Sequence, residues 1–232
     1  MTSTTTEFAV NMTCKKCARA VEESLSSPHI NIVDINVAKS SVIVESTLST
    51  TELLQKLETS GRKVVVKGLG GTTAGVAVLE AGEQKVKGVV RFVQLPNSCI
   101  VDGTVDGLEP GKYQLSVHEN GDISRGCESC GDTFNPVGKF MGLEGKQYGD
   151  LGVIEAGSNG RSTFRLENKI VHLPELIGRS LIISKPYTNG EKRIICGIIA
   201  RSAGLFQNPK TICACSGASM WDEKNVPMKP SL

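Results

Sequence analysis

The sequence has few aromatic residues, only three histidines, no cluster of basic residues and no long apolar run. Aromatic residues make up 4% of the 232 residues whereas glycine occurs 25 times, and this combination favours small β-rich units with many turns over long helical bundles. The 26 basic and 24 acidic residues are interspersed, so no basic patch indicates a nucleic-acid partner. No apolar stretch approaches the length of a membrane span. The chain is long enough for two small domains and a tail.

The first six residues carry no charge and lack the apolar stretch of a signal peptide, so we expect a cytoplasmic protein, with minor mitochondrial or nuclear pools left open. Cytosolic thiols stay mostly reduced, and clustered cysteines there are more often metal-binding or redox-active than structural. Six of the eight cysteines form three close pairs and two stand alone: Cys14 with Cys17, Cys127 with Cys130, Cys213 with Cys215, and then Cys99 and Cys196.

The first seventy residues alternate between strand and helix patterns. Ala18, Val21 and Leu25 recur at helical spacing, and a proline just beyond them is expected after a helix end. We expect helices at residues 15–25 and 50–57, and strands at residues 7–12, 30–37, 41–45 and 63–67. This order, βαββαβ, is the ferredoxin-like arrangement and predicts an α+β domain.

Residues 68–73 are rich in glycine and threonine and predict a flexible joint. Beyond them the helical pattern disappears, and an all-β sandwich or barrel is predicted from short runs at residues 75–79, 87–94, 99–105, 111–119, 161–166, 180–184 and 194–199. After Leu205 the periodicity is lost, so we expect a tail with little structure of its own. The predicted domains are therefore residues 1–70, 74–203 and 204–232.

The first cysteine pair lies in Met12-Thr13-Cys14-Lys15-Lys16-Cys17, where a strand ends and a helix begins. Such a loop places both sulfur atoms at the surface, near a helix N-terminus that favours thiolate. Two thiolates suit Cu(I), whereas a structural zinc site uses four ligands and this domain has no second pair. We therefore expect Cys14 and Cys17 to bind Cu(I), with Met12 tucked beneath the loop. A thioredoxin-like redox pair is the alternative.

This segment resembles the heavy-metal-associated domain of copper chaperones and copper-pumping ATPases, whose signature is Met-x-Cys-x-x-Cys. The resemblance covers the whole first domain and implies copper binding at Cys14 and Cys17. A copper transporter or glutathione is then a candidate donor of the metal.

The pair Cys213-Ala214-Cys215 lies in the predicted tail. One intervening residue is too few for an unstrained disulfide, but both sulfur atoms can contact one soft metal ion, share a Cu(I) cluster with another chain, or take turns in thiol–disulfide exchange. Exposed free cysteines are a liability, so we favour such a function over two incidental residues. Trp221, just downstream, either anchors the tail on a partner or packs on the protein's own β domain.

The middle domain carries several short motifs in a fixed order, among them Val117-His118-Glu119-Asn120-Gly121-Asp122, Gly149-Asp150-Leu151-Gly152, Ile177-Gly178-Arg179-Ser180 and Arg193-Ile194-Ile195-Cys196-Gly197. From residue 74 to residue 202 the sequence resembles Cu/Zn superoxide dismutase. The resemblance implies an eight-stranded Greek-key barrel and an intrasubunit disulfide, here Cys127–Cys196. Arg193 matches the arginine that guides superoxide to copper in the enzyme.

Most metal ligands of that enzyme are missing. The enzyme holds copper with four histidines, and zinc with three histidines and an aspartate, one histidine being shared; here only His118 and Asp150 fall on matching positions. The other copper positions hold Ser116, Thr133 and Ser184, and residues 137–147 contain no histidine. Hydroxyl groups are poor ligands for Cu(I), so we expect a metallochaperone without dismutase activity. Zinc occupancy of this domain stays open.

A barrel without metals can still bind a dismutase subunit of the same fold, because dismutases are two-fold dimers with an apolar contact. Residues 119–122 and 198–200 match regions of that contact. The segment from Arg201 through the Cys-x-Cys pair resembles animal copper chaperones for superoxide dismutase, and so does Cys127-x-x-Cys130-Gly131. The resemblance implies a chaperone that docks on apo-dismutase as a heterodimer, delivers Cu(I) and promotes the target's disulfide. A homodimer through the same barrel also fits.

Two other functions compete with this interpretation. A divergent dismutase fused to a metal-capture domain predicts superoxide turnover by the copper-loaded chain. A general copper buffer with an idle β domain predicts no complex with dismutase. In each case Cys99 and Cys130 are expected to be inert core thiols.

Overall fold

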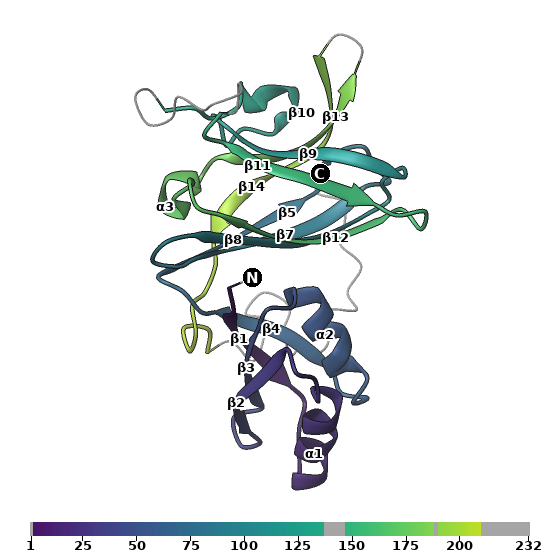
Figure 1. The fold of residues 1–232 in the computed structure, drawn as a ribbon, viewed down its shortest axis with the longest axis vertical. Helices are drawn as coiled ribbons and strands as arrows, with labels where there is room; N and C mark the ends of the chain where they lie inside the picture. The colour runs from purple at the N-terminus through teal and green to yellow at the C-terminus, as the bar shows by residue number, and fades with distance from the viewer. Residues whose placement is uncertain (1, 137–146, 188–189, 210–232) are drawn as a thin grey trace. The chain divides into compact units, whose positions relative to one another are not determined.

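The computed structural model describes residues 2–136, 147–187 and 190–209, without the side chain of residue 187 (Figure 1). Its chain separates into two compact units. The first, here the N-terminal unit, contains residues 3–48, 52–69 and 203–209; the second, here the barrel unit, is chiefly residues 70–202. The expected division into residues 1–70, 74–203 and 204–232 stays a prediction. Cys213, Cys215 and Trp221 lie outside the described residues.

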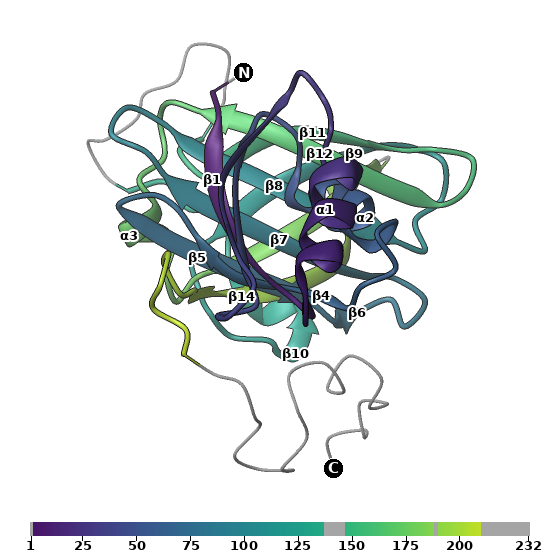
Figure 2. The ribbon, with the colours of Figure 1, turned by 90° about the horizontal axis from the view of Figure 1, so that it is seen from below.

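The N-terminal unit has the predicted βαββαβ order: β1 (Thr4–Val10), α1 (Lys15–Ser24), β2 (Ile30–Asn36), β3 (Ser41–Ser46), α2 (Thr50–Glu58) and β4 (Val64–Leu69). Its strands form an antiparallel sheet in the order β2-β3-β1-β4. Both helices lie next to each other on one face of this sheet, as the two views in Figure 1 and Figure 2 show.

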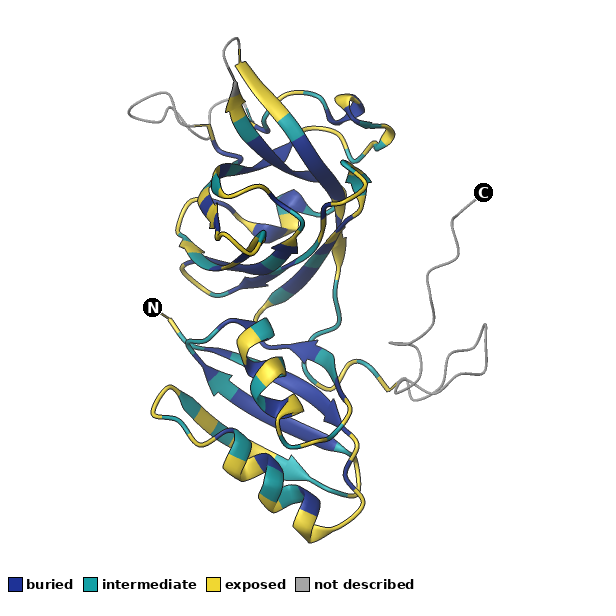
Figure 3. Ribbon diagram, turned by 90° about the vertical axis from the view of Figure 1, so that its right-hand side faces the viewer, coloured by how far each residue is buried: buried dark blue, intermediate teal, exposed yellow. Residues whose placement is uncertain are grey.

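Alternation along the strands decides which residues face the helices. In β1 the side chains of Phe8 and Val10 enter the core, where Val21 and Leu25 from the α1 end and Leu57 from α2 meet them. Successive strand residues point to opposite faces, so the residues between the core positions lie on the face away from the helices. The exposed residues of α1 and α2 lie outward (Figure 3), which gives each helix one apolar stripe.

The barrel unit is built from ten strands and two short helical turns in the part of the chain that is described: β5 (Thr73–Leu79), β6 (Ala81–Gly82), β7 (Lys87–Gln94), β8 (Cys99–Asp106), β9 (Gly111–His118), β10 (Ser124–Cys127), β11 (Asp150–Ala156), β12 (Arg161–Asn168), β13 (Ser180–Tyr187), β14 (Gly190–Arg201), with the 3₁₀ turn Glu128–Cys130 and α3 (Leu173–Leu176). Eight strands follow one path, β11-β9-β13-β14-β5-β7-β8-β12. Its two end strands approach each other, which gives a nearly closed antiparallel barrel.

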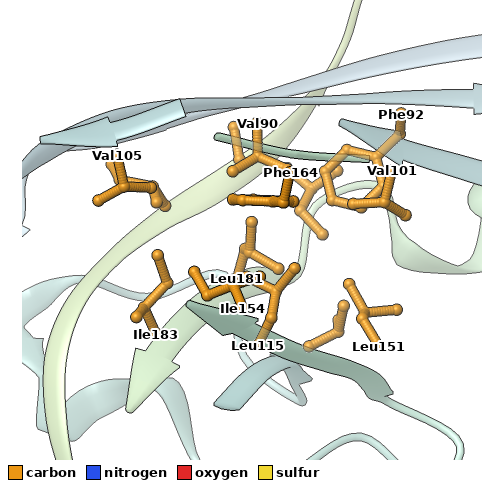
Figure 4. Packing of buried hydrophobic residues seen from close by; sticks show 14 of the residues in the cluster. Val90, Phe92, Val101, Val105, Leu115, Leu151, Ile154, Phe164, Leu181 and Ile183 are labelled. Carbon is orange, nitrogen blue, oxygen red and sulfur yellow. The ribbon is translucent and has the colours of Figure 1, made fainter. Parts of the chain in front are cut away.

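Side chains from opposite walls fill the barrel. Those of β7, β8 and β12 meet those of β9, β11 and β13 in the interior (Figure 4): Val90, Phe92, Val101, Val105 and Phe164 on one side, and Leu115, Leu151, Ile154, Leu181 and Ile183 on the other. This continuous apolar core holds the outer surface of the barrel in a fixed shape.

Several details differ from the expectations, and β6, β10 and the short helix α3 were not predicted. The joint is shorter than residues 68–73, because Gly68 and Leu69 belong to β4 and Thr73 begins β5. The strand β11 was not expected, because Gly152 has a positive φ of 130° and the pairing with β9 shifts register there, which disturbs the alternation.

Candidate metal centre

Cys14 and Cys17 lie at the junction between β1 and α1. Cys14 is the N-cap residue of α1 with an extended backbone (φ −157°, ψ 169°), and its carbonyl accepts the N–H groups of Cys17 and Ala18. The side chain of Cys14 is exposed, whereas Cys17 sits in the first turn and is 2% exposed. The helix start therefore holds the two residues side by side with only Cys14 at the surface, so the expectation that both sulfur atoms lie at the surface is wrong for Cys17, whose side chain packs in the core of the unit.

The two sulfur atoms are 3.2 Å apart, and the hydroxyl oxygen of Thr13 lies 3.7 Å from the sulfur atom of Cys17. The pKa of Cys17 is lowered from 9.0 to about 6, first by the backbone N–H of Thr13, then by the Cys14 side chain and the Thr13 hydroxyl. Cys17 is thus mostly thiolate at neutral pH. A two-coordinate soft cation fits this arrangement with one atom exposed for transfer.

Met12 is 3% exposed and packs in the core of the N-terminal unit, which confirms its expected place beneath the loop. Lys15 and Lys16 are exposed beside the sulfur pair and can offset the negative charge of a bis-thiolate complex. Sequence reasoning missed the role of Thr13, since its largest effect comes from a backbone N–H that every residue except proline has.

The cysteines of the barrel unit are arranged differently. Cys127, at the end of β10, and Cys196, in β14, form the expected disulfide, with 5.6 Å between their Cα atoms. Cys99 and Cys130 are fully buried free thiols, and burial raises the pKa of Cys99 to about 12. They have the burial expected of inert core thiols.

Of the positions that correspond to copper ligands, His118 and Ser116 contact each other, whereas Ser184 contacts Glu191. His118 is 1% exposed; its Nδ1 lies 3.0 Å from the carbonyl of Gly131, and its Nε2 lies 3.1 Å from the hydroxyl of Ser116. A carbonyl only accepts, so Nδ1 carries the proton and Nε2 accepts from Ser116. Burial holds the pKa of His118 below its usual range, so the ring is neutral. Ser184 donates to Glu191 at 2.7 Å.

Arg193 is held by the loop beside this histidine. Its guanidinium donates to the carbonyls of Cys127 and Gly131 at 2.9 and 2.8 Å. A hollow of about 360 Å³ next to it is lined by Glu128, Gly131, Asp132, Glu191 and Arg193. Three carboxylates against one guanidinium give this hollow a potential that repels anions.

Asp150, at the matching zinc position, accepts the N–H of Gln147 at 2.8 Å. Within residues 2–136, 147–187 and 190–209, no group of three or more His, Cys, Asp or Glu residues is arranged to hold a metal ion. Among the same residues, no helix is both long and apolar enough to cross a membrane.

The outer side of the barrel carries an apolar pair. Val78 in β5 and Ile198 in β14 are 45% and 38% exposed, and they flank the paired core residues Ala77 and Ile199. We call Val78 and Ile198 the docking face. The predicted contact loop follows β9: Arg179 donates to the carbonyl of Glu119 at 2.7 Å and ties that loop to the barrel.

Comparisons with known proteins agree with this geometry. The heavy-metal-associated domain family matches residues 7–63, and the copper/zinc superoxide dismutase family matches residues 86–199. A copper chaperone for superoxide dismutase from Mus musculus is 44% identical over 96% of this chain and 89% of its own length. The Homo sapiens relative of that name is 43% identical over 97% and 90%, and a superoxide dismutase 1 copper chaperone from Saccharomyces cerevisiae is 30% identical over 94% and 92%. The chain therefore belongs to the family of copper chaperones for superoxide dismutase.

Proposed function

We propose that this chain binds Cu(I) on Cys14 and Cys17 and delivers it to apo-superoxide dismutase. The observation that carries the proposal is the sulfur pair itself, 3.2 Å apart at a helix start with one exposed thiol and one thiol of low pKa. Low-coordinate thiolate sites bind Cu(I) and exchange ligands one at a time, so copper passes to the target without release as a free ion.

The barrel unit recognises the target. Dismutase subunits associate through an isologous contact, and a barrel of the same fold can replace one subunit in a heterodimer. The exposed pair Val78 and Ile198 supports this, because two apolar side chains on neighbouring strands form the centre of a small hydrophobic contact. Without a target, the same face supports a homodimer.

The tail acts after docking. Cys213 and Cys215 take over copper, promote the target's disulfide, or do both. In the redox step a two-electron oxidant such as dioxygen first converts Cys213 and Cys215 to a disulfide. A target thiolate attacks this disulfide, and the second target thiolate then releases the tail as a dithiol, so two electrons move from the target to the tail. A double Cys213→Ser, Cys215→Ser variant that loads and oxidises the target at the normal rate would remove the tail from the mechanism.

The need for reduced thiols bears on the cellular location of the protein. The pair Cys14 and Cys17, in which the Cys14 thiol is exposed, stays available for copper only where thiols are kept reduced, which supports a cytoplasmic location. A copper transporter or glutathione supplies the metal there.

The test is copper transfer from the purified chain to reduced, zinc-bound apo-dismutase, scored by the gain of dismutase activity. We expect transfer from the native chain, none from a Cys14→Ser, Cys17→Ser variant, and unchanged transfer from Cys99→Ala, which removes a thiol from the barrel core instead. A copper buffer would form no complex with dismutase in size-exclusion chromatography, and a divergent dismutase would turn over superoxide alone; either result would overturn the proposal.

A further inference from the structure

A buried carboxylate in the N-terminal unit contacts the far end of the described chain. Glu7, in β1, is 1% exposed. Its Oε1 atom accepts from the hydroxyl of Ser41 at 3.2 Å and lies 3.1 Å from Nζ of Lys67. Its Oε2 atom accepts the backbone N–H of Phe206 at 2.7 Å. One oxygen is thus satisfied within the sheet and the other by a residue 199 positions away.

The segment around Phe206 docks on the edge strand of the same sheet. The N–H of Leu69 donates to the carbonyl of Ala203 at 3.1 Å, and Leu69 forms a parallel bridge with Gly204. A Cβ on Gly68 would overlap the carbonyl of Gly204, so glycine is needed for this close approach. We call residues 203–207 the tail root, since the sequence with Cys213 and Cys215 follows directly.

The hydrogen bond to Glu7 determines the conformation of the tail root. Phe206 has a φ of +63°, a strained value for a residue other than glycine. Its side chain is 72% exposed and therefore gains little from packing. The tail root closes as a turn, with the N–H of Gln207 donating to the carbonyl of Gly204 at 3.2 Å. The charge-assisted bond from the Phe206 N–H to a buried carboxylate is what offsets the strain.

We propose that Glu7 is a positioning residue for copper transfer, which holds the root of the tail on the unit that carries Cys14 and Cys17. The inference rests on the proposed role of Cys213 and Cys215 as copper acceptors. Cys14 lies seven positions after Glu7, and Cys213 lies seven positions after Phe206.

A fully extended chain spans about 3.3–3.6 Å per residue, so each sulfur pair begins within about 25 Å of the anchor along the chain. Both pairs are therefore tethered to one point by short segments, which raises their effective concentration for each other. If the tail root detaches as a whole, with its contacts to Leu69 lost as well, the next fixed residue is Ser202, whose N–H donates to Ala74 in the barrel unit. The tether to Cys213 then grows from seven to eleven residues, and a −3/2 power dependence lowers the effective concentration about twofold before any effect of the changed attachment point.

The test compares two substitutions at the exposed end of this contact. Phe206→Pro removes the N–H and forbids the positive φ, whereas Phe206→Gly keeps the N–H and favours the positive φ. Both remove the aromatic ring, so the ring is not the variable. Glu7→Gln weakens the anchor from the other side, and Ser41→Ala is its control, because it removes only a bond to Oε1.

Two readouts on the full chain decide the outcome. Native-state hydrogen exchange reports the anchor: we expect exchange at least tenfold faster at the Phe206 amide in Glu7→Gln and at the Leu69 amide in Phe206→Pro, and unchanged exchange in Ser41→Ala. Stopped-flow transfer from chain loaded at Cys14 and Cys17 to apo-dismutase reports the function: we expect a rate twofold or more lower in Phe206→Pro and Glu7→Gln, and native in Phe206→Gly.

Unchanged exchange in both anchor variants would show that no anchor exists. Faster exchange with unchanged transfer would show that the anchor is structural only. If the native chain transfers no copper at all, the proposed function fails; if it does and the anchor variants transfer equally fast, only the positioning role of Glu7 fails.

Discussion

A carboxylate placed on the docking face should weaken the complex with dismutase about 100-fold. Val78 and Ile198 are 45% and 38% exposed. Full burial of a valine or isoleucine side chain stabilises by about 1.5–3 kcal/mol, so a partner that covers both exposed fractions gains about 1–2.5 kcal/mol. Val78→Glu removes the valine's share, about 0.7–1.4 kcal/mol, and leaves a charge unpaired in the contact, which costs about 2 kcal/mol more. A total loss of about 3 kcal/mol weakens binding about 100-fold.

The control is Val153→Glu. Val153 is 54% exposed in β11, an end strand of the sheet path that lies four strands away from β5. Because the substitution is the same and both valines are about half exposed on a strand, it reports the effect of an added surface charge alone. Titration calorimetry with reduced apo-dismutase measures both affinities. The reasoning is refuted if Val78→Glu binds as tightly as the native chain, or if Val153→Glu loses as much.

The pKa of Cys17, about 6, predicts that iodoacetamide modifies Cys17 in the apo protein at a rate that is half-maximal near pH 6. The rate falls as the pH falls through that value, because the thiolate is protonated there. Peptide mass spectrometry follows the reaction, and a midpoint near pH 9 would contradict the assigned hydrogen bonds. Leu115→Ala, at a fully buried barrel position, should destabilise the barrel unit by about 2–5 kcal/mol while copper binding by Cys14 and Cys17 stays intact. Denaturant unfolding and copper titration of that variant measure the two effects separately.

Local patterns were sufficient to predict the N-terminal unit. Val21 and Leu25 recur at helical spacing, and the strands alternate, so the order of elements follows from one buried face per element. The sulfur pair was predicted for the same reason, since a Cys-x-x-Cys spacing at a strand-to-helix junction places both side chains in one loop. Both features depend on residues close together in the sequence.

Features that depend on distant residues were not predictable in this way. Glu7 lies on the face of β1 away from the helices, where a charged side chain is normally solvated. The hydrogen bond from the Phe206 N–H to Glu7 forms only because residues 203–207 return to the edge of the sheet, and no local sequence pattern predicts that contact. Likewise, β11 is irregular because Gly152 follows a shift in its pairing with β9.

The barrel positions that match the metal ligands of dismutase are poorly suited to binding copper. A dismutase subunit needs several imidazoles with free lone pairs, whereas the lone pair on Nε2 of His118 accepts from Ser116 and the other ring nitrogen donates to Gly131. Ser184 is bound to Glu191, and Arg193 is held by two carbonyls.

Copper binding at His118 would therefore require breaking the hydrogen bond to Ser116 in a buried site, for a single nitrogen ligand. Cys14 and Cys17 offer two sulfur ligands, one exposed at the surface and the other already deprotonated at neutral pH. Ser116 and Ser184, which stand at ligand positions of the enzyme, thus form hydrogen bonds within the barrel instead. Within the described residues, the sulfur pair is then the favoured place for a soft cation, and the barrel remains available for recognition.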